Sequence, residues 1–194
     1  MDKISAETIA RGLEATEPQP VSERLAGVSV ILTEKRGPPA VLLIKRSERE
    51  GDPWSGQVAF PGGKKDRNDG SVVDTAIRET MEEVGIDLIR DARLLGFFGS
   101  FRTHTGKMVV VPAVFVMKNR ARIETNQEVS SYRWVSLDRL RAPESRTTYD
   151  APVGDLRREM PAIVVSDYLI WGLTLRMIEV FLERVVSQRP HSSA

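Results

Sequence analysis

The chain lacks cysteine altogether and contains little histidine and few aromatic residues. Its 194 residues include no cysteine, 2 histidines and 6% Phe, Trp and Tyr. The absence of cysteine excludes thiol catalysis and thiolate-bound zinc, and it fits a reducing compartment. His104 and His191 lie far apart in the sequence, which also disfavours a histidine-based zinc site. A metal site in this chain would therefore depend on oxygen ligands.

The chain also has no excess of charge of one sign and no long apolar run. Lysine and arginine number 28 against 27 acids, a formal net charge of +1. This balance argues against a nucleic-acid polymer as partner, because nonspecific binding needs a basic face. The most hydrophobic stretch, residues 168–181, is interrupted by Arg176 and Glu179 and is too short to span a membrane. With no signal peptide visible, we expect a cytoplasmic protein with no membrane partner.

Size and apolar periodicity predict one α/β domain. We expect an N-terminal helix and linker over residues 1–25, one main domain over 26–187 and a disordered tail over 188–194. Helices are predicted at 6–13, 72–84, 137–140 and 166–186. Strands are predicted at 26–33, 40–45, 57–60, 92–101, 107–117, 123–125 and 131–135. Because helices interrupt the strands irregularly, this order predicts a mixed sheet between helical layers.

Residues 60–85 form the part of the chain most suited to chemistry. They read FPGGKKDRNDGSVVDTAIRETMEEVG. Gly62 and Gly63 end a strand sharply, since glycine permits positive φ, and backbone amides in such a turn can approach phosphate oxygens. Both glycines are therefore candidate substrate contacts. Ser71 and Gly85 stand where the N-cap and the left-handed C-cap of the helix are expected.

Three glutamates crowd onto one side of that helix. Glu79, Glu82 and Glu83 occupy positions i, i+3 and i+4, along the edge of the apolar stripe, and Glu83 falls inside the stripe. Neighbouring carboxylates repel unless a cation lies between them. An oxygen-only shell that leaves room for water and phosphate suits Mg²⁺ or Mn²⁺. The pattern therefore favours metal-assisted attack of water on phosphorus, and the alternative is an acidic surface helix that binds no metal.

Residues 78–86 resemble the second half of the Nudix box. That box runs Gly, five residues, Glu, seven residues, Arg-Glu, an aliphatic residue, any residue, Glu-Glu, any residue, Gly and an aliphatic residue. Thr80 stands at the first aliphatic position. The first half departs from the pattern, because counting from Gly63 reaches Asp69 instead of Glu, and eight residues instead of seven precede Arg78. The match leaves the role of Asp69 open.

The resemblance implies a Nudix hydrolase domain over 26–187, folded as an α/β/α sandwich with a mixed sheet. It makes Glu79, Glu82 and Glu83 the metal ligands, with Arg78 orienting Glu79 through a charge-assisted hydrogen bond. Glu128 lies where many members carry a further acid, as a ligand or general base. A loop acid facing solvent is an equal alternative for Glu128. Many relatives pair as dimers, so a homodimer is also expected.

Residues 41–63 and 170–177 are similar to signatures of the coenzyme A pyrophosphatase branch, although the loop at 51–55 differs from its commonest form. The resemblance implies a hydrolase acting on acid anhydrides in phosphorus-containing compounds, with a small-molecule nucleotide substrate. Coenzyme A or its derivatives are favoured. The alternatives are hydrolysis of ADP-ribose, a dinucleotide or a nucleoside triphosphate, and a non-catalytic Nudix-fold module that binds a nucleotide. Retention of all four charged box residues favours an enzyme.

Basic residues outside the box are further candidates for substrate binding. Lys45 and Arg46 end a predicted strand, where cations would face the box, and ordinary solvated strand ends are nearly as expected. Arg102 begins a polar turn that could grip a second phosphate, and a plain turn is the alternative. Trp54 would stack on an adenine ring or, more commonly, pack on the sheet.

Overall fold

Strand alternation divides the apolar residues of this chain between the two faces of one central sheet. The computed structural model describes residues 5–187 except 23, 34–37, 52–53, 120 and 154–155. The predicted tail at 188–194 lies outside the described residues. The elements are α1 (Ala6–Arg11), β1 (Leu25–Thr33), β2 (Ala40–Arg46), β3 (Val58–Ala59), β4 (Gly62–Lys64), α2 (Val72–Val84), α3 (Leu88–Asp91), β5 (Ala92–Phe97), β6 (Phe101–Arg102), β7 (Val109–Met117), β8 (Val129–Ser136), α4 (Leu137–Arg141), the short 3₁₀ helix η1 (Pro143–Ser145), β9 (Arg146–Val153), β10 (Leu156–Val165), β11 (Tyr168–Trp171) and α5 (Gly172–Ser187).

The central sheet is mixed. Its strand order is β3-β2-β1-β7-β5, with β4 paired to β1, β6 to β7 and β8 to β2. β1 and β7 run parallel, from Leu25 opposite Val109 to Leu32 opposite Val116, and the other pairs are antiparallel. The predicted mixed sheet is confirmed.

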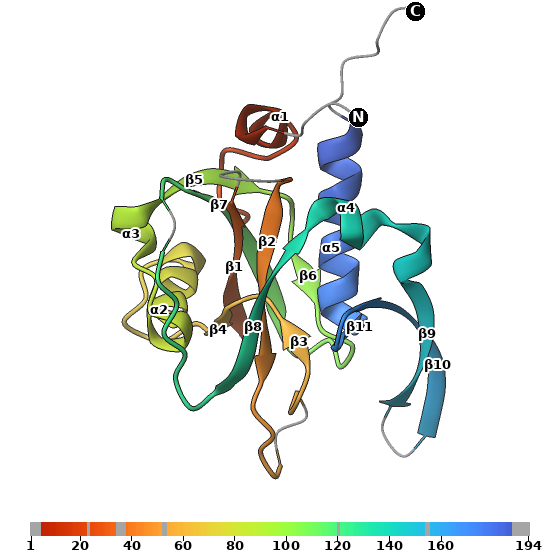
Figure 1. Ribbon diagram of the computed structural model, residues 1–194. Coiled ribbons are helices and arrows are strands. Elements are labelled where there is room, and N and C mark those ends of the chain that lie inside the picture. The colour runs from red at the N-terminus through yellow and green to blue at the C-terminus, as the bar shows by residue number, and fades with distance from the viewer. Residues whose placement is uncertain are drawn as a thin grey trace, which may run out of the picture.

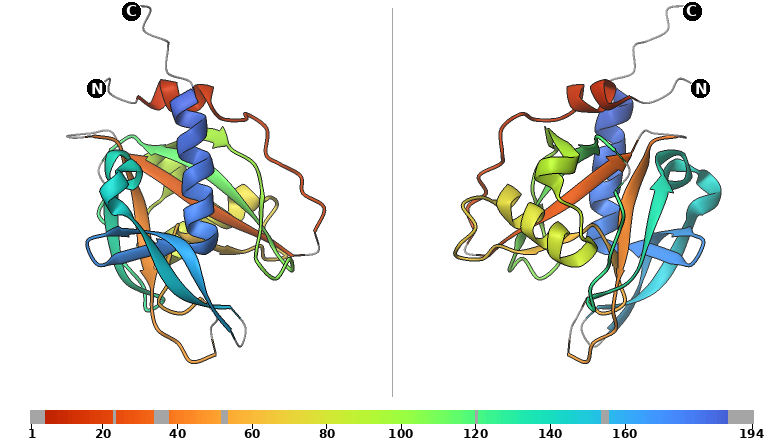
Figure 2. Two further views of the ribbon diagram at one scale, coloured as in Figure 1. Left: turned by 90° about the vertical axis from the view of Figure 1, so that its right-hand side faces the viewer. Right: turned by 60° about the vertical axis from the view of Figure 1, so that its left-hand side comes forward.

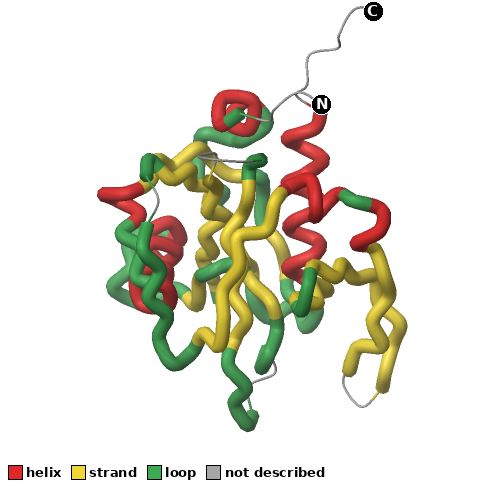
Figure 3. The backbone as a smooth tube through the Cα atoms, in the orientation of Figure 1, coloured by secondary structure: helices red, strands yellow, loops and turns green. Residues whose placement is uncertain are grey.

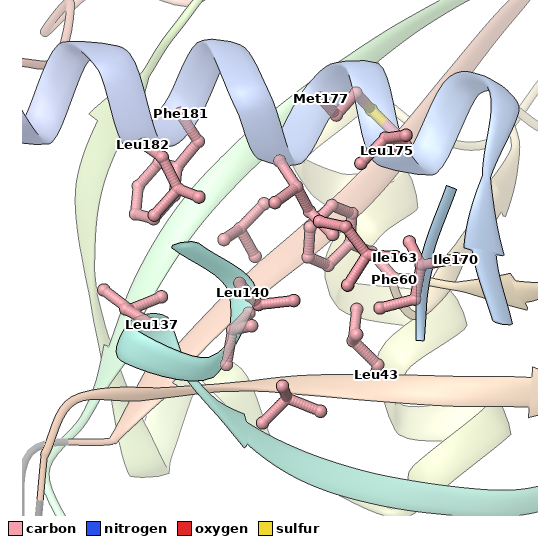
Figure 4. Packing of buried hydrophobic residues seen from close by; sticks show 14 of the residues in the cluster. Leu43, Phe60, Leu137, Leu140, Ile163, Ile170, Leu175, Met177, Phe181 and Leu182 are labelled. Carbon is pink, nitrogen blue, oxygen red and sulfur yellow. The ribbon is translucent and has the colours of Figure 1, made fainter. Parts of the chain in front are cut away.

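Helices cover both faces of this sheet (Figures 1 and 2). On β2, Leu43 belongs to the apolar cluster that includes α1, α4 and α5, whereas Leu42 and Ile44 belong to the cluster that includes α2 and α3. Figure 4 shows Leu43 and Phe60 facing the side chains of α5. This arrangement is an α/β/α sandwich, as the sequence predicted.

The C-terminal part of the fold differs from the prediction. The helix predicted at 166–186 begins only at Gly172, because residues 168–171 form β11. β9, β10 and β11 build a separate antiparallel sheet, which Figure 1 shows beside α5, and none of its strands was predicted. Most described residues of β9 and the first half of β10 are exposed on both faces, so they carry no alternating apolar signal.

The strand predicted at 123–125 was also wrong. The connection between β7 and β8 runs beside α2 (Figure 3), and the amides of Glu124 and Asn126 donate to the carbonyls of Val84 and Glu83. These carbonyls lie in the last turn of α2, where no intrahelical donor remains. The hydrogen bonds that a strand would have made are therefore directed to the end of the helix.

The predicted strand at 92–101 is divided into two. β5 ends at Phe97 and β6 covers only Phe101–Arg102, with Gly99 between them at a φ of 111°. The first strand of the box region is likewise short, because β3 covers only Val58–Ala59 and Gly62–Lys64 pairs separately with β1 as β4. Among the described residues, no helix is long and apolar enough to cross a membrane.

Helix α2 lies close against β1. A Cβ atom at Gly27 would fall 2.0 Å from the carbonyl oxygen of Val72, so only glycine fits there. Two turns along, the hydroxyl of Thr80 lies 2.8 Å from Ser29 Oγ and 2.7 Å from the carbonyl oxygen of Ala76, all buried. Thr80 therefore stands at the aliphatic position of the box because its hydroxyl has a partner on β1.

We expect the Ser29 and Thr80 hydroxyls to be energetically coupled. Thr80→Val and Ser29→Ala should each lower the free energy of unfolding by about 1 kcal/mol, since each leaves buried polar atoms with fewer partners. The double variant should lose less than the sum, because no hydroxyl is then left behind. Urea denaturation of the four proteins measures the coupling. Strict additivity would show that the pair does not act together.

Candidate active site

The acids of the box are carried by a helix that is capped at both ends. Ser71 Oγ accepts from the Asp74 amide at 3.1 Å, and Gly85 adopts a left-handed φ of 70°. α2 covers Val72–Val84, which are the predicted bounds. The three glutamates therefore project from the C-terminal half of a short, fixed helix, along the flank that faces the glycine turn.

Glu83 is the most buried of these acids. Its side chain is 2% exposed, as its position inside the apolar stripe predicted. Glu83 Oε2 accepts from the Gly62 amide at 2.9 Å, and Oε1 lies 4.0 Å from Arg46 Nη1. Burial raises the pKa of Glu83 to about 7, although the Gly62 amide opposes the shift.

Glu79 packs directly against the glycine turn. A Cβ atom at Gly63 would lie 2.4 Å from the carboxyl carbon of Glu79. Burial also raises the pKa of Glu79, and the nearby charges of Glu82 and Glu128 act in the same direction. Gly62 and Gly63 thus hold the acids, and their contact with a phosphate stays a prediction.

Arg78 lies among these carboxylates. Its Nη1 donates to Glu79 Oε1 at 2.9 Å and lies 3.4 Å from Glu82 Oε1. The predicted contact between Arg78 and Glu79 is therefore present. Glu82 is the most open of the three acids, with 55% of its side chain exposed.

Asp69, whose role the sequence left open, is the principal partner of Arg78. Arg78 Nε donates to Asp69 Oδ1 at 3.0 Å, and Nη2 donates to Oδ2 at 2.9 Å. The buried carboxylate also accepts from Thr75 Oγ1 and from the Asp66 amide. These bonds, led by the one from Arg78, hold the pKa of Asp69 well below its usual range. The loop with the inserted residue therefore folds so that Asp69 fixes Arg78.

Glu128 follows a turn that is bound to the end of α2, because the Asn126 amide donates to the Glu83 carbonyl at 3.2 Å. Glu128 Oε1 lies 3.0 Å from Arg49 Nη1, and the charge of Glu128 raises the pKa values of both Glu79 and Glu83. Arg49 was not singled out in the sequence. Its position shortly after the strand that carries Arg46 could have indicated a further basic residue near the box. Its partner Glu128, however, lies 79 residues away in the sequence.

The other predicted substrate contacts, Lys45, Arg46 and Arg102, do not all lie beside the box acids. Arg46 lies on the α2 side of β2, since its Nη1 is 4.0 Å from Glu83 Oε1. Lys45 follows the alternation of Leu43 and faces the α5 side. Arg102 on β6 lies three strands away from Lys65, which follows the glycine turn. Arg102 pairs with Val109, Val109 pairs with Leu25, and the Leu25 carbonyl accepts from the Lys65 amide. Three strand spacings place the Cα atoms of Arg102 and Lys65 roughly 14 Å apart. The roles of Lys45 and Arg102 stay predictions.

Trp54 lies beside Lys64 of β4. Its side chain is 40% exposed, and Lys64 Nζ lies 5.9 Å from its ring centroid. A separate cavity of about 360 Å³ lies beyond the C-terminal end of α2, and it contains none of the predicted site residues. It is lined by Gly85, Arg90, Asp91, Asn119, Ala121, Arg122 and Glu124.

The chemistry of the acids suits a hard divalent cation. In the side-chain arrangement of the described residues, no three acids or histidines are close enough together to hold one. Burial and mutual repulsion nevertheless raise the pKa values of Glu79 and Glu83, and a positive charge between them would offset both effects. The assignment of Glu79, Glu82 and Glu83 as metal ligands stays a prediction.

The raised pKa of Glu83 predicts a pH-dependent stability. Between its ordinary value of 4.5 and about 7, the folded protein binds a proton that the unfolded chain has lost. The free energy of unfolding should therefore fall as the pH rises through this window. Without divalent cations, Glu83→Gln should match the wild type near pH 4.5 and exceed it by on the order of 3 kcal/mol above pH 7.

Urea denaturation at several pH values measures this difference. Glu159→Gln, which changes an exposed acid on β10, is the matched control and should show no such trend. A constant difference between Glu83→Gln and the wild type across the whole range would contradict the assignment.

Known proteins resemble this chain over most of its length. A relative from Schizosaccharomyces pombe, an uncharacterised protein, is 38% identical over 116 residues, covering 56% of this chain and 35% of the relative. The chain therefore spans about a third of that protein's length. The mitochondrial coenzyme A diphosphatase NUDT8 of Homo sapiens is 32% identical over 162 residues, covering 81% of this chain and 68% of the relative.

A solved structure and a family model agree with these relatives. The MutT/nudix family protein from Enterococcus faecalis has a TM-score of 0.60 at 21% identity, covering 88% of this chain and 64% of that one. This likeness shows the shared fold. The model of the NUDIX domain matches residues 23–155, which include β1 to β8, α2 and every acid of the candidate site. The chain belongs to the Nudix family.

Proposed function

We propose that this Nudix hydrolase cleaves the diphosphate linkage of a nucleoside diphosphate derivative, with coenzyme A or its derivatives as first-choice substrates. The observation that carries the proposal is the buried Glu83 carboxylate, which lies with Glu79 against the glycine turn. The choice of substrate is supported by residues 41–63 and by the human relative, which is named a coenzyme A diphosphatase.

Glu79, Glu82 and Glu83 would hold Mg²⁺ or Mn²⁺. The bound cations would polarise the phosphoryl oxygens and neutralise charge on the leaving phosphate. Asp69 fixes Arg78, which in turn holds Glu79 in place, and the Gly62 amide fixes Glu83. Glu128 would serve as the general base, and its position near α2 is supported by the Asn126 amide, which donates to the Glu83 carbonyl at 3.2 Å.

Two further expectations stay predictions. The human relative is named as mitochondrial, so only the sequence of this chain, in which no signal peptide is visible, supports a cytoplasmic location. A homodimer is expected from the resemblance alone.

Glu83→Gln should abolish turnover while the protein stays folded. The amide keeps the acceptor for Gly62 but removes the negative charge that would bind a cation, so the rate should fall by at least about 100-fold. Steady-state hydrolysis at saturating Mg²⁺ measures the loss, and circular dichroism checks the fold. Glu159→Gln is the control. A near-wild-type rate for Glu83→Gln would show that the box acids do not bind the catalytic metal.

A substrate panel tests which bond is cleaved. Coenzyme A, ADP-ribose, a diadenosine polyphosphate and a nucleoside triphosphate are compared in one preparation with Mn²⁺, and the products are identified by mass. Coenzyme A should give adenosine 3′,5′-bisphosphate and 4′-phosphopantetheine, with the largest kcat/KM of the panel. A larger value for another compound would reassign the substrate. Calorimetric binding without any product would identify a non-catalytic module.

A further inference from the structure

Arg49 lies at the edge of the acidic cluster, on the loop between β2 and β3. Its guanidinium donates to Glu128 on the loop before β8. The contact continues the pairing of β2 and β8 beyond the sheet: Arg46 lies opposite Val129, and the Ser47 amide donates to the Glu128 carbonyl at 2.8 Å. Strand pairing thus fixes where the two side chains meet.

The Arg49–Glu128 pair is close to the proposed chemistry. The Asn126 amide, two residues before Glu128, donates to the Glu83 carbonyl at 3.2 Å, and Arg46, three residues before Arg49, places its Nη1 4.0 Å from Glu83 Oε1. Arg78, which contacts Glu79, also donates to Asp69, so its guanidinium is held by carboxylates of the protein. Arg49 is therefore a basic group at the solvent-facing side of the cluster.

The Arg49–Glu128 pair is also suited to exchange. The side chains of Arg49 and Glu128 are 44% and 40% exposed, and exposed pairs of this kind contribute little to stability. A guanidinium presents a planar fork of donors that matches a phosphate at least as well as a carboxylate. An incoming diphosphate can therefore replace Glu128 as the partner of Arg49.

The loop does not depend on the Arg49 side chain for its position. Ser47 Oγ donates to the Gln127 carbonyl at 2.9 Å, and the Arg49 amide donates to Ser55 Oγ at 2.9 Å. Gly51 and Gly56 supply the positive φ values of the turn. Replacing the Arg49 side chain should leave these backbone contacts in place, which makes substitutions there interpretable.

We propose that Arg49 binds the diphosphate of the substrate by exchanging Glu128 for a phosphate oxygen, which releases Glu128 to act as the base. The proposal rests on the proposed function. In the hydrolysis, the water oxygen bonds to phosphorus and its proton passes to Glu128. The bridging P–O bond breaks, and the bridging oxygen leaves on the other phosphate.

The test measures binding and turnover separately. Calorimetry in Mn²⁺ gives the Kd of α,β-methylene-ADP, whose bridging carbon prevents hydrolysis, and steady-state assays give kcat and KM for the best substrate. The variants are Arg49→Ala, Arg49→Lys and Glu128→Gln. The matched control is Arg157→Ala, which breaks an exposed arginine–aspartate pair with Asp150 on the β9–β10 hairpin.

Arg49→Ala should raise both the Kd and KM tenfold or more, while kcat changes less than threefold because Glu128 is already released. Arg49→Lys should restore part of the affinity. Glu128→Gln should lower kcat and tighten analogue binding severalfold, since Arg49 then has no competing carboxylate. Arg157→Ala should match the wild type in every measurement.

Other results would contradict either the proposal for Arg49 or the proposed function. A Kd for Arg49→Ala within twofold of the wild type overturns the proposal, as does a fall in kcat with unchanged Kd, which would indicate a purely structural pair. If the wild type binds the analogue through Arg49 but hydrolyses no member of the panel, the proposed function fails and the binding role of Arg49 stands. If the wild type hydrolyses a member of the panel but does not bind the analogue, the proposal for Arg49 is overturned and the proposed function stands.

Discussion

The carboxylate of Glu83, buried between α2 and the sheet, determines how the helix and the glycine turn must fit together. A buried carboxylate is costly unless a donor satisfies it, and the Gly62 amide is that donor. The amide can reach Glu83 only if α2 lies close to β4 and β1. Side chains are accordingly absent where the backbones approach, at Gly27, Gly62 and Gly63, where a Cβ atom would fall within 2.0 to 2.4 Å of another atom.

From this buried point, exposure increases across the box acids. The side-chain exposure rises from 2% at Glu83 to 18% at Glu79 and 55% at Glu82. Arg78 spans the more exposed pair and is itself fixed by Asp69. The cluster is therefore buried at its base and open at its outer side, which suits the metal and phosphate site that we propose.

Local rules predicted the part of the site that depends on a single helix. Ser71 and Gly85 are capping residues with local signatures, so the bounds of α2 followed from the sequence, and the burial of Glu83 followed from its angle around the helix axis. The partner of Arg78 did not follow, because Asp69 reaches it through an irregular loop. Arg49 was missed for the same reason: its contact with Glu128 depends on which strands pair. The sheet formed by β9, β10 and β11 was missed because its exposed strands have no buried face to reveal them.

In the proposed function, the residues held by local contacts carry out the chemistry, and those held by long-range contacts select the substrate. The acids are held by one helix and by backbone atoms of the glycine turn, and neither depends on what lies beyond the diphosphate. The outer groups come from connections between strands: Arg49 and Trp54 from the β2–β3 loop, and Glu128 from the β7–β8 connection. Their side chains are partly exposed, and none of them takes part in the hydrogen bond between Glu83 and the Gly62 amide. Under the function that we propose, the same acids therefore serve different nucleotide derivatives, while the loops around them determine which one is held.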